Sequence, residues 1–144
     1  MARTESAAGV PKPGPAPVQG MGMLIGLLFL VLGAFELMPG VTVGDGPGRL
    51  FGVFAVSGAW TLAHLVTGVA AVFCTRSAKL SSRFLLVGGA CYALLGIAGL
   101  LPLPRAFDEV FPMNTAGICL ALGFGTAMLI LGAGWRRRRP VRRR

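Results

Sequence analysis

Charged residues are scarce in this sequence, and acidic residues are the scarcest. Only 13% of the 144 residues are charged, whereas soluble domains carry about a quarter. Asp and Glu together number 5, and Lys and Arg number 14. Hydrophobic residues make up 54% of the chain, and the mean hydropathy is +0.72. This composition excludes an ordinary cytosolic domain and indicates a small integral membrane protein.

Residues and motifs that support catalysis are also few. The chain has one histidine and three cysteines, and it lacks a Gly-rich phosphate loop, a nucleophile elbow and a Cys-x-x-Cys pair. Cys74, Cys91 and Cys119 do not stand at zinc-ligand spacing with His64. We therefore expect no enzyme activity, no metal site and no cofactor.

Four apolar stretches are long enough to cross a membrane as helices. A helix rises 1.5 Å per residue, so about 20 residues cross a bilayer core about 30 Å thick. The length of the stretches and their lack of alternation argue against strands. The sequence thus predicts an all-α membrane protein, a four-transmembrane-helix bundle. Its predicted spans are residues 21–38, 51–73, 84–101 and 113–135.

Basic residues predict the orientation of these spans. Twelve of the 14 Lys and Arg lie in residues 1–20, in the connection 74–83, or in residues 136–144. Four of the five acids lie in or beside the other two connections. By the positive-inside rule, both termini are cytoplasmic in a multi-pass protein of the plasma (cell inner) membrane. We expect residues 1–20, rich in Pro, Gly and Ala, to be a disordered tail and residues 136–144 to be a basic tail.

The C-terminal tail reads RRRRPVRRR. Clustered arginine can neutralise nucleic-acid phosphates, but a basic cluster directly cytoplasmic of a span is drawn to anionic lipid headgroups. We therefore expect the lipid bilayer, and not nucleic acid, as the partner of this tail. The residues expected to contact anionic lipid are Arg136, Arg137, Arg138, Arg139, Arg142, Arg143 and Arg144.

The two halves of the chain resemble each other. When the third predicted span is aligned on the first, Gly89 pairs with Gly26, and when the fourth is aligned on the second, Gly125 pairs with Gly68. Each half is then a helical hairpin that enters from the cytoplasm, and the halves are parallel repeats about an axis along the membrane normal. Small residues at helical spacing let helix backbones approach, either within one chain or between copies.

Two segments resemble a known family. The stretches FAVSGAWTLAHLVTG (54–68) and FPMNTAGICLALGFG (111–125) resemble the bacterial four-span membrane family catalogued as domain of unknown function 4383. The His-Leu-x-x-Gly element of that family is matched by His64, Leu65 and Gly68. The resemblance implies four spans, but it implies no activity because none is established for the family.

The second segment matches the family less completely. Residues 112–116, PMNTA, match a Pro-Leu-Asn-Thr-Ala opening of the fourth span. Ala121 stands where a second histidine is usual, and Trp60 and Thr61 replace a His-Asn pair in the second span. These departures replace polar residues of the family, so a site that the family builds from those residues is not expected to be complete in this chain.

His64 lies near the middle of the second predicted span. An ionisable group inside a membrane is by default a functional-site hypothesis. We expect a neutral imidazole that hydrogen-bonds to Ser57, Thr61, Thr67 or a neighbouring helix. A proton relay needs an acidic partner at this depth. The sequence predicts none, since Glu36 lies at the outer end of the first span.

Asn114 and Thr115 open the fourth predicted span. Either side chain can accept a hydrogen bond from the first unpaired amides of the helix, as an N-cap does. The alternative is a shallow ligand or cation site formed with Asp108, Glu109 and Asp45.

The sequence predicts a non-enzymatic role for this membrane protein. The first hypothesis is a structural or accessory subunit that acts through helix contacts with itself or with a larger membrane complex. The alternative is permeation of a small solute or a proton through a homo-oligomer, with His64 near the pathway.

Overall fold

The computed structural model describes residues 16–43, 48–102 and 104–137, and these residues are mostly helical. The helices are α1 (Pro17–Glu36), α2 (Gly58–Cys74), α3 (Ala78–Ala98), α4 (Arg105–Val110) and α5 (Thr115–Arg137). A small antiparallel sheet joins α1 to α2. Its strands, in spatial order, are β1 (Thr42–Val43), β2 (Arg49–Leu50) and β3 (Phe54–Ala55).

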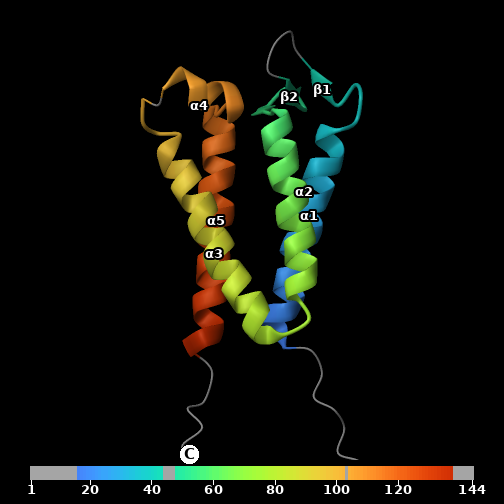
Figure 1. Ribbon diagram of the computed structural model, residues 1–144, viewed down its shortest axis with the longest axis vertical. Helices are drawn as coiled ribbons and strands as arrows, with labels where there is room; N and C mark the ends of the chain where they lie inside the picture. The colour runs from blue at the N-terminus through green and yellow to red at the C-terminus, as the bar shows by residue number, and fades with distance from the viewer. Residues whose placement is uncertain (1–15, 44–47, 103, 138–144) are drawn as a thin grey trace, which may run out of the picture.

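The long helices form two pairs (Figure 1). The first helix pair is α1 with α2, and the second helix pair is α3 with α5. Figure 1 shows the pairs close together where α2 connects to α3, and further apart where the sheet and α4 lie. We call these the connection end and the sheet end. α1 begins and α5 ends at the connection end.

Glycines bring the two backbones of each pair into direct contact. A Cβ atom on Gly26 would lie 3.1 Å from the carbonyl oxygen of Gly68, and one on Gly68 would lie 2.9 Å from that of Gly26. In the second pair, a Cβ on either Gly89 or Gly125 would lie 2.9 Å from the carbonyl oxygen of the other. In lipid, such close van der Waals packing is a main source of helix association.

A second contact repeats nearer the sheet end of each pair. The Leu65 side chain of α2 packs over Gly33 of α1, where a Cβ atom would lie 2.8 Å from the leucine Cγ. The Leu122 side chain of α5 packs over Gly96 of α3, where the corresponding distance is 2.7 Å. Each helix pair is therefore held by a glycine–glycine contact and a leucine seated on a glycine.

Within residues 16–43, 48–102 and 104–137, three helices are long and apolar enough to cross a membrane. They are α1, α3 and α5, with 20, 21 and 23 residues. α2 is also apolar but has 17 residues. The predicted apolar segments 21–38, 84–101 and 113–135 are largely confirmed as helices, and the protein is a multi-pass membrane protein.

The prediction of a span over residues 51–73 is wrong at its start. The chain turns between β2 and β3, where Phe51 and Gly52 have φ angles of 52° and 71°. α2 begins only at Gly58, after Ser57 caps it by accepting a hydrogen bond from the Trp60 N–H at 3.3 Å. A side chain oxygen placed at the N-cap satisfies one of the amides that the first helical turn leaves unpaired.

The predicted tails also begin and end elsewhere. α1 begins at Pro17, and residues 17–20 are therefore helical. Proline is tolerated at this position because the first N–H groups of a helix have no partner within the helix. The Gln19 side chain accepts from the Ala16 N–H and donates to the Thr75 carbonyl, which ties this turn to the end of α2. Residues 1–15 lie outside the described residues. Arg136 and Arg137 form the last turn of α5, and residues 138–144 lie outside the described residues.

The glycine contacts can be tested within one helix. We expect Gly125→Ala to lower the free energy of unfolding by roughly 1–3 kcal/mol, as overpacking does. A Cβ there would lie 2.5 Å from the Ala93 backbone nitrogen. Gly123→Ala is the matched control, because it makes the same change in helix propensity but its Cβ meets nothing within 4 Å. The measurement is thermal or denaturant unfolding in detergent. Equal stability of the two variants would contradict the contact.

Candidate functional site

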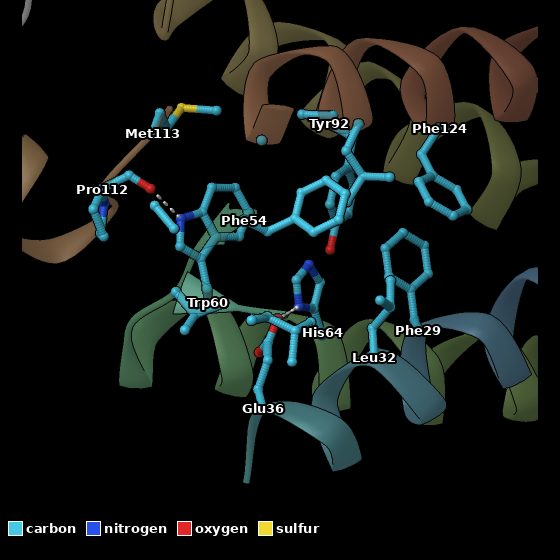
Figure 2. Close-up of a pocket in the computed structure, with 16 residues that line it drawn as sticks. Phe29, Leu32, Glu36, Phe54, Trp60, His64, Tyr92, Pro112, Met113 and Phe124 are labelled. Atoms are coloured by element: carbon cyan, nitrogen blue, oxygen red, sulfur yellow. Dashed lines mark hydrogen bonds and ion pairs between the residues drawn. The ribbon is translucent and has the colours of Figure 1, made fainter. Parts of the chain in front are cut away.

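A small cavity lies between the two helix pairs, toward the sheet end. Its volume is about 30 Å³, which is enough to admit a water molecule. All four long helices contribute side chains, and Leu50, Phe54 and Val56 of the sheet region also line the cavity. Figure 2 shows Phe54 among these lining residues. Its lining also includes Phe29, Glu36, Trp60, His64, Tyr92, Pro112, Ala121 and Phe124.

Glu36 and His64 form a buried pair at this cavity. The distance between His64 Nδ1 and Glu36 Oε1 is 2.8 Å, and the side chains are 9% and 2% exposed. Glu36 is the last residue of α1 and His64 lies in the second turn of α2, so the pair joins the two helices of the first pair. The second carboxylate oxygen, Oε2, is buried and has no hydrogen-bond partner among the described residues.

Aromatic rings enclose the imidazole. The Trp60 and Phe29 rings stack on it, with centroid distances of 5.6 Å and 5.7 Å. The Tyr92 ring of α3 lies nearly parallel to it at 6.4 Å, and Figure 2 shows the tyrosine hydroxyl directed toward the imidazole. This hydroxyl lies near the Thr67 side chain but makes no hydrogen bond of good geometry within the described part of the chain. The rings cover the faces of the imidazole and leave its edges for polar contacts.

Hydrogen bonds link the two halves of the chain above the cavity, at the sheet end. The Trp60 indole N–H donates to the Pro112 carbonyl at 3.1 Å, and the Ser57 hydroxyl donates to the Val110 carbonyl at 2.7 Å. The Asn114 side chain amide donates to the Val53 carbonyl. These bonds fix the segment between α4 and α5 against the start of α2.

The structure assigns His64 a partner on the neighbouring helix and not among the residues of its own span. Ser57 caps α2, and the Thr61 hydroxyl donates to the Ser57 carbonyl at 3.2 Å. The prediction that no acid reaches His64 is wrong. Glu36 ends α1, but its side chain packs into the bundle because the end of α1 lies beside the start of α2.

Sequence reasoning missed Glu36 because it depends on helix register. The Gly26–Gly68 contact fixes which turns of α1 and α2 face each other. A hairpin built on that contact brings the last turn of α1 close to the second turn of α2. The one sequence feature that points to Glu36 is its position as an acid at the end of an apolar segment. An exposed residue at the membrane surface has the same feature, so the sequence does not distinguish the two.

Asn114 has the geometry of an N-cap. Its side chain oxygen accepts from the Gly117 N–H at 2.9 Å, and its carbonyl accepts from the Ile118 N–H. Thr115, the first residue of α5, is exposed, as are Asp108 and Glu109 on α4. Asp45 lies outside the described residues. Within the described part of the chain, no three His, Cys, Asp or Glu side chains gather as metal ligands would.

The tail arginines are described only in part. Arg136 and Arg137 are exposed in the last turn of α5, at the connection end. The lipid contacts expected of Arg138, Arg139 and residues 142–144 fall outside the described residues.

A double-mutant cycle measures the coupling of Glu36 and His64. Glu36→Leu or His64→Leu alone leaves the other polar group buried without its partner, which costs roughly 1–3 kcal/mol. We expect the double variant to lose less stability than the sum of the single losses. Glu109→Leu removes an exposed acid and serves as the control. Unfolding in mixed micelles gives the four free energies, and strict additivity would contradict a direct interaction.

The helices and the cavity residues described above fall almost entirely within one stretch that matches a known family. The family model with the description "Domain of unknown function (DUF4383)" matches residues 19–134, which include Glu36, His64 and Tyr92. This confirms the family predicted from the sequence. Neither the curated proteins nor the solved structures contain a match. Because the matched stretch covers most of the chain, the protein belongs to the DUF4383 family.

Proposed function

We propose that this protein is non-enzymatic and that its cavity is a proton-relay site, where Glu36 and His64 take up and release a proton within the membrane. The observation that carries the proposal is the 2.8 Å contact between two ionisable side chains that are almost fully buried. Ionisable groups at such positions mark proton and ion pathways in membrane proteins. Glu36 is also the acidic partner that a relay through His64 requires.

The chemistry of the site suits proton transfer. Imidazole can hold a proton on either ring nitrogen, so it can accept on one side and release on the other. Nδ1 faces Glu36, and the Tyr92 hydroxyl points toward the imidazole from α3. Glu36 Oε2 is a further buried acceptor, and the cavity has space for one water molecule. These groups form a short series from the first helix pair to the second.

We further propose that α2 is a fourth span and that the helix pairs are two parallel hairpin repeats. The 17 residues of α2 rise about 26 Å, near the bilayer core thickness. When the second half of the sequence is aligned on the first, the Gly89–Gly125 contact corresponds to the Gly26–Gly68 contact. These matched contacts support the repeat.

We also propose that the connection end is the cytoplasmic end, in the inner membrane of a bacterial cell. Both α1 and α5 have a terminus there, as an even number of spans requires (Figure 1). The basic residues of the connection and of the last turn of α5 lie at this end, and the described acids Glu36, Asp108 and Glu109 lie at the other. This charge asymmetry supports the orientation.

A second candidate function is that of an accessory subunit that contacts another membrane helix. The outward face of α5 favours it, because that face exposes Thr115, Cys119, Gly123 and Ala127. Among the residues described for α5, Ile130 is the one exposed large apolar side chain, whereas α1 exposes many along its length. Small residues allow a second helix, from another copy or from a larger complex, to approach closely.

Proton flux in liposomes tests the relay. We expect the reconstituted protein to pass protons under an imposed potential, measured with a pH-sensitive dye trapped inside. His64→Asn and Glu36→Gln should each lower the flux at least about tenfold, because each removes one proton-binding group of the relay.

Asp108→Asn is the matched control, because it removes an exposed acid of α4. Its flux should equal that of the unchanged protein. The elution volume in detergent shows that each variant is folded. A flux that survives both cavity substitutions would exclude this pair from the pathway.

Native mass determination tests the accessory function. We expect the protein, purified in mild detergent from its native membrane, to elute with a stoichiometric membrane partner or a second copy. Gly123→Leu should remove that association without unfolding the chain, because a side chain there meets open space. Val66→Leu, on the exposed face of α2, is the control. Unchanged association in Gly123→Leu would remove α5 from the interface.

A further inference from the structure

A basic hollow lies between α3 and α5 at the connection end. Its volume is about 160 Å³, and four residues line it: Lys79, Ser82, Arg83 and Arg136. Three of the four carry a positive charge. The hollow is separate from the cavity that holds Glu36 and His64, because the two share no lining residue among those described.

Helix geometry directs the three cations to one place. Lys79 and Arg83 are four residues apart on α3, so they lie on the same face one turn from each other. Arg136 lies one turn beyond Gly132 on α5. The buried Ser82 hydroxyl donates to the Gly132 carbonyl at 3.0 Å, which fixes the two helices against each other beside the hollow.

Close packing at Gly132 supports this geometry. A Cβ atom there would lie 3.1 Å from the Ser82 carbonyl oxygen and 2.8 Å from Leu86 Cγ. The backbones of α3 and α5 therefore approach closely at Gly132, one turn before Arg136. The distance between the cations of α3 and Arg136 is set by backbone packing and not by flexible loops.

Acidic side chains of the described residues do not neutralise these cations. The acids that the structure describes are Glu36, Asp108 and Glu109, and they lie toward the sheet end. Over residues 16–43, 48–102 and 104–137, the one ion pair is that of Glu36 with His64. Three like charges around one hollow repel one another unless an anion sits between them.

We propose that this hollow binds the phosphate group of an anionic phospholipid. Arginine pairs with phosphate through two parallel hydrogen bonds, and lysine adds a compact positive charge. The hollow lies at the ends of two apolar helices, and the neighbouring Leu80 and Val87 of α3 are exposed where acyl chains would lie. Basic pockets between membrane helices on the cytoplasmic side bind lipid headgroups in this manner. This inference does not depend on the proton relay.

Native mass spectrometry of the full chain in a neutral detergent tests the site. The probes are phosphatidylglycerol and phosphatidylcholine with the same acyl chains. We expect one phosphatidylglycerol to be retained with higher affinity than phosphatidylcholine. Lys79→Gln, Arg83→Gln and Arg136→Gln should each weaken its binding about fivefold, and the triple variant should abolish retention.

Arg76→Gln is the matched control, because it removes the same charge from an exposed residue at the same end of the molecule that does not line the hollow. Its affinity should stay within about twofold of the unchanged protein, as a contact outside the site requires. If Arg76→Gln weakens binding as much as Arg136→Gln, the lipid contact is diffuse and the proposal is overturned. Equal retention of phosphatidylcholine would also overturn it.

Inorganic phosphate distinguishes the two sources of the phosphate group. At millimolar concentration it should leave the bound phosphatidylglycerol in place, since the acyl chains add apolar contact that free phosphate lacks. Displacement of the lipid by inorganic phosphate would show a general anion site and would overturn the lipid assignment. Lys79, Arg83 and Arg136 are exposed, so their replacement leaves the packing of the core unchanged. The melting temperature of each variant in detergent verifies this.

Discussion

Direct backbone contact at paired glycines is the constraint on which this structure depends. Burial of apolar side chains gains little against lipid, so helices in a membrane must associate through close packing. The contacts of Gly26 with Gly68 and of Gly89 with Gly125 supply it. They also fix the helix register within each pair. That register brings Glu36 beside His64, and the site therefore follows from the packing of residues that carry no side chain.

The Glu36–His64 pair is difficult to explain by packing alone. A buried ionic pair adds little to stability once both groups have lost their water, and apolar residues of similar size can replace it. The cavity itself gives an example. Ala121, the counterpart of His64 when α5 is aligned on α2, lines the same cavity with a methyl group. An apolar side chain therefore lines the cavity at the position of α5 that corresponds to His64.

Much of the helical architecture and the candidate residue His64 could be predicted from the sequence, whereas its partner Glu36 could not. Long apolar segments and the positions of the charges indicate the membrane helices. The bilayer allows few secondary structures, because every backbone polar group in lipid must be hydrogen-bonded within the protein. Asn114 also has the expected capping geometry, because an N-cap depends only on neighbours along the chain. The partner of His64 depends on the register between α1 and α2. The short sheet depends on the turn at Phe51 and Gly52, within a segment as apolar as the helices.

The helix pairs have a mechanical consequence for the cavity. Each pair is held by backbone contact, so it behaves as a stiff arm. Residues 75–77 join the arms at the connection end, and the hydrogen bonds of Trp60, Ser57 and Asn114 join them again at the far ends, where the sheet lies. A change in the angle between the arms must therefore break or stretch these hydrogen bonds. The cavity lies toward the far ends, where Tyr92 on one arm faces His64 on the other (Figure 2). The separation of these two rings is therefore fixed from both ends of the arms, and it can change only together with the hydrogen bonds above the cavity.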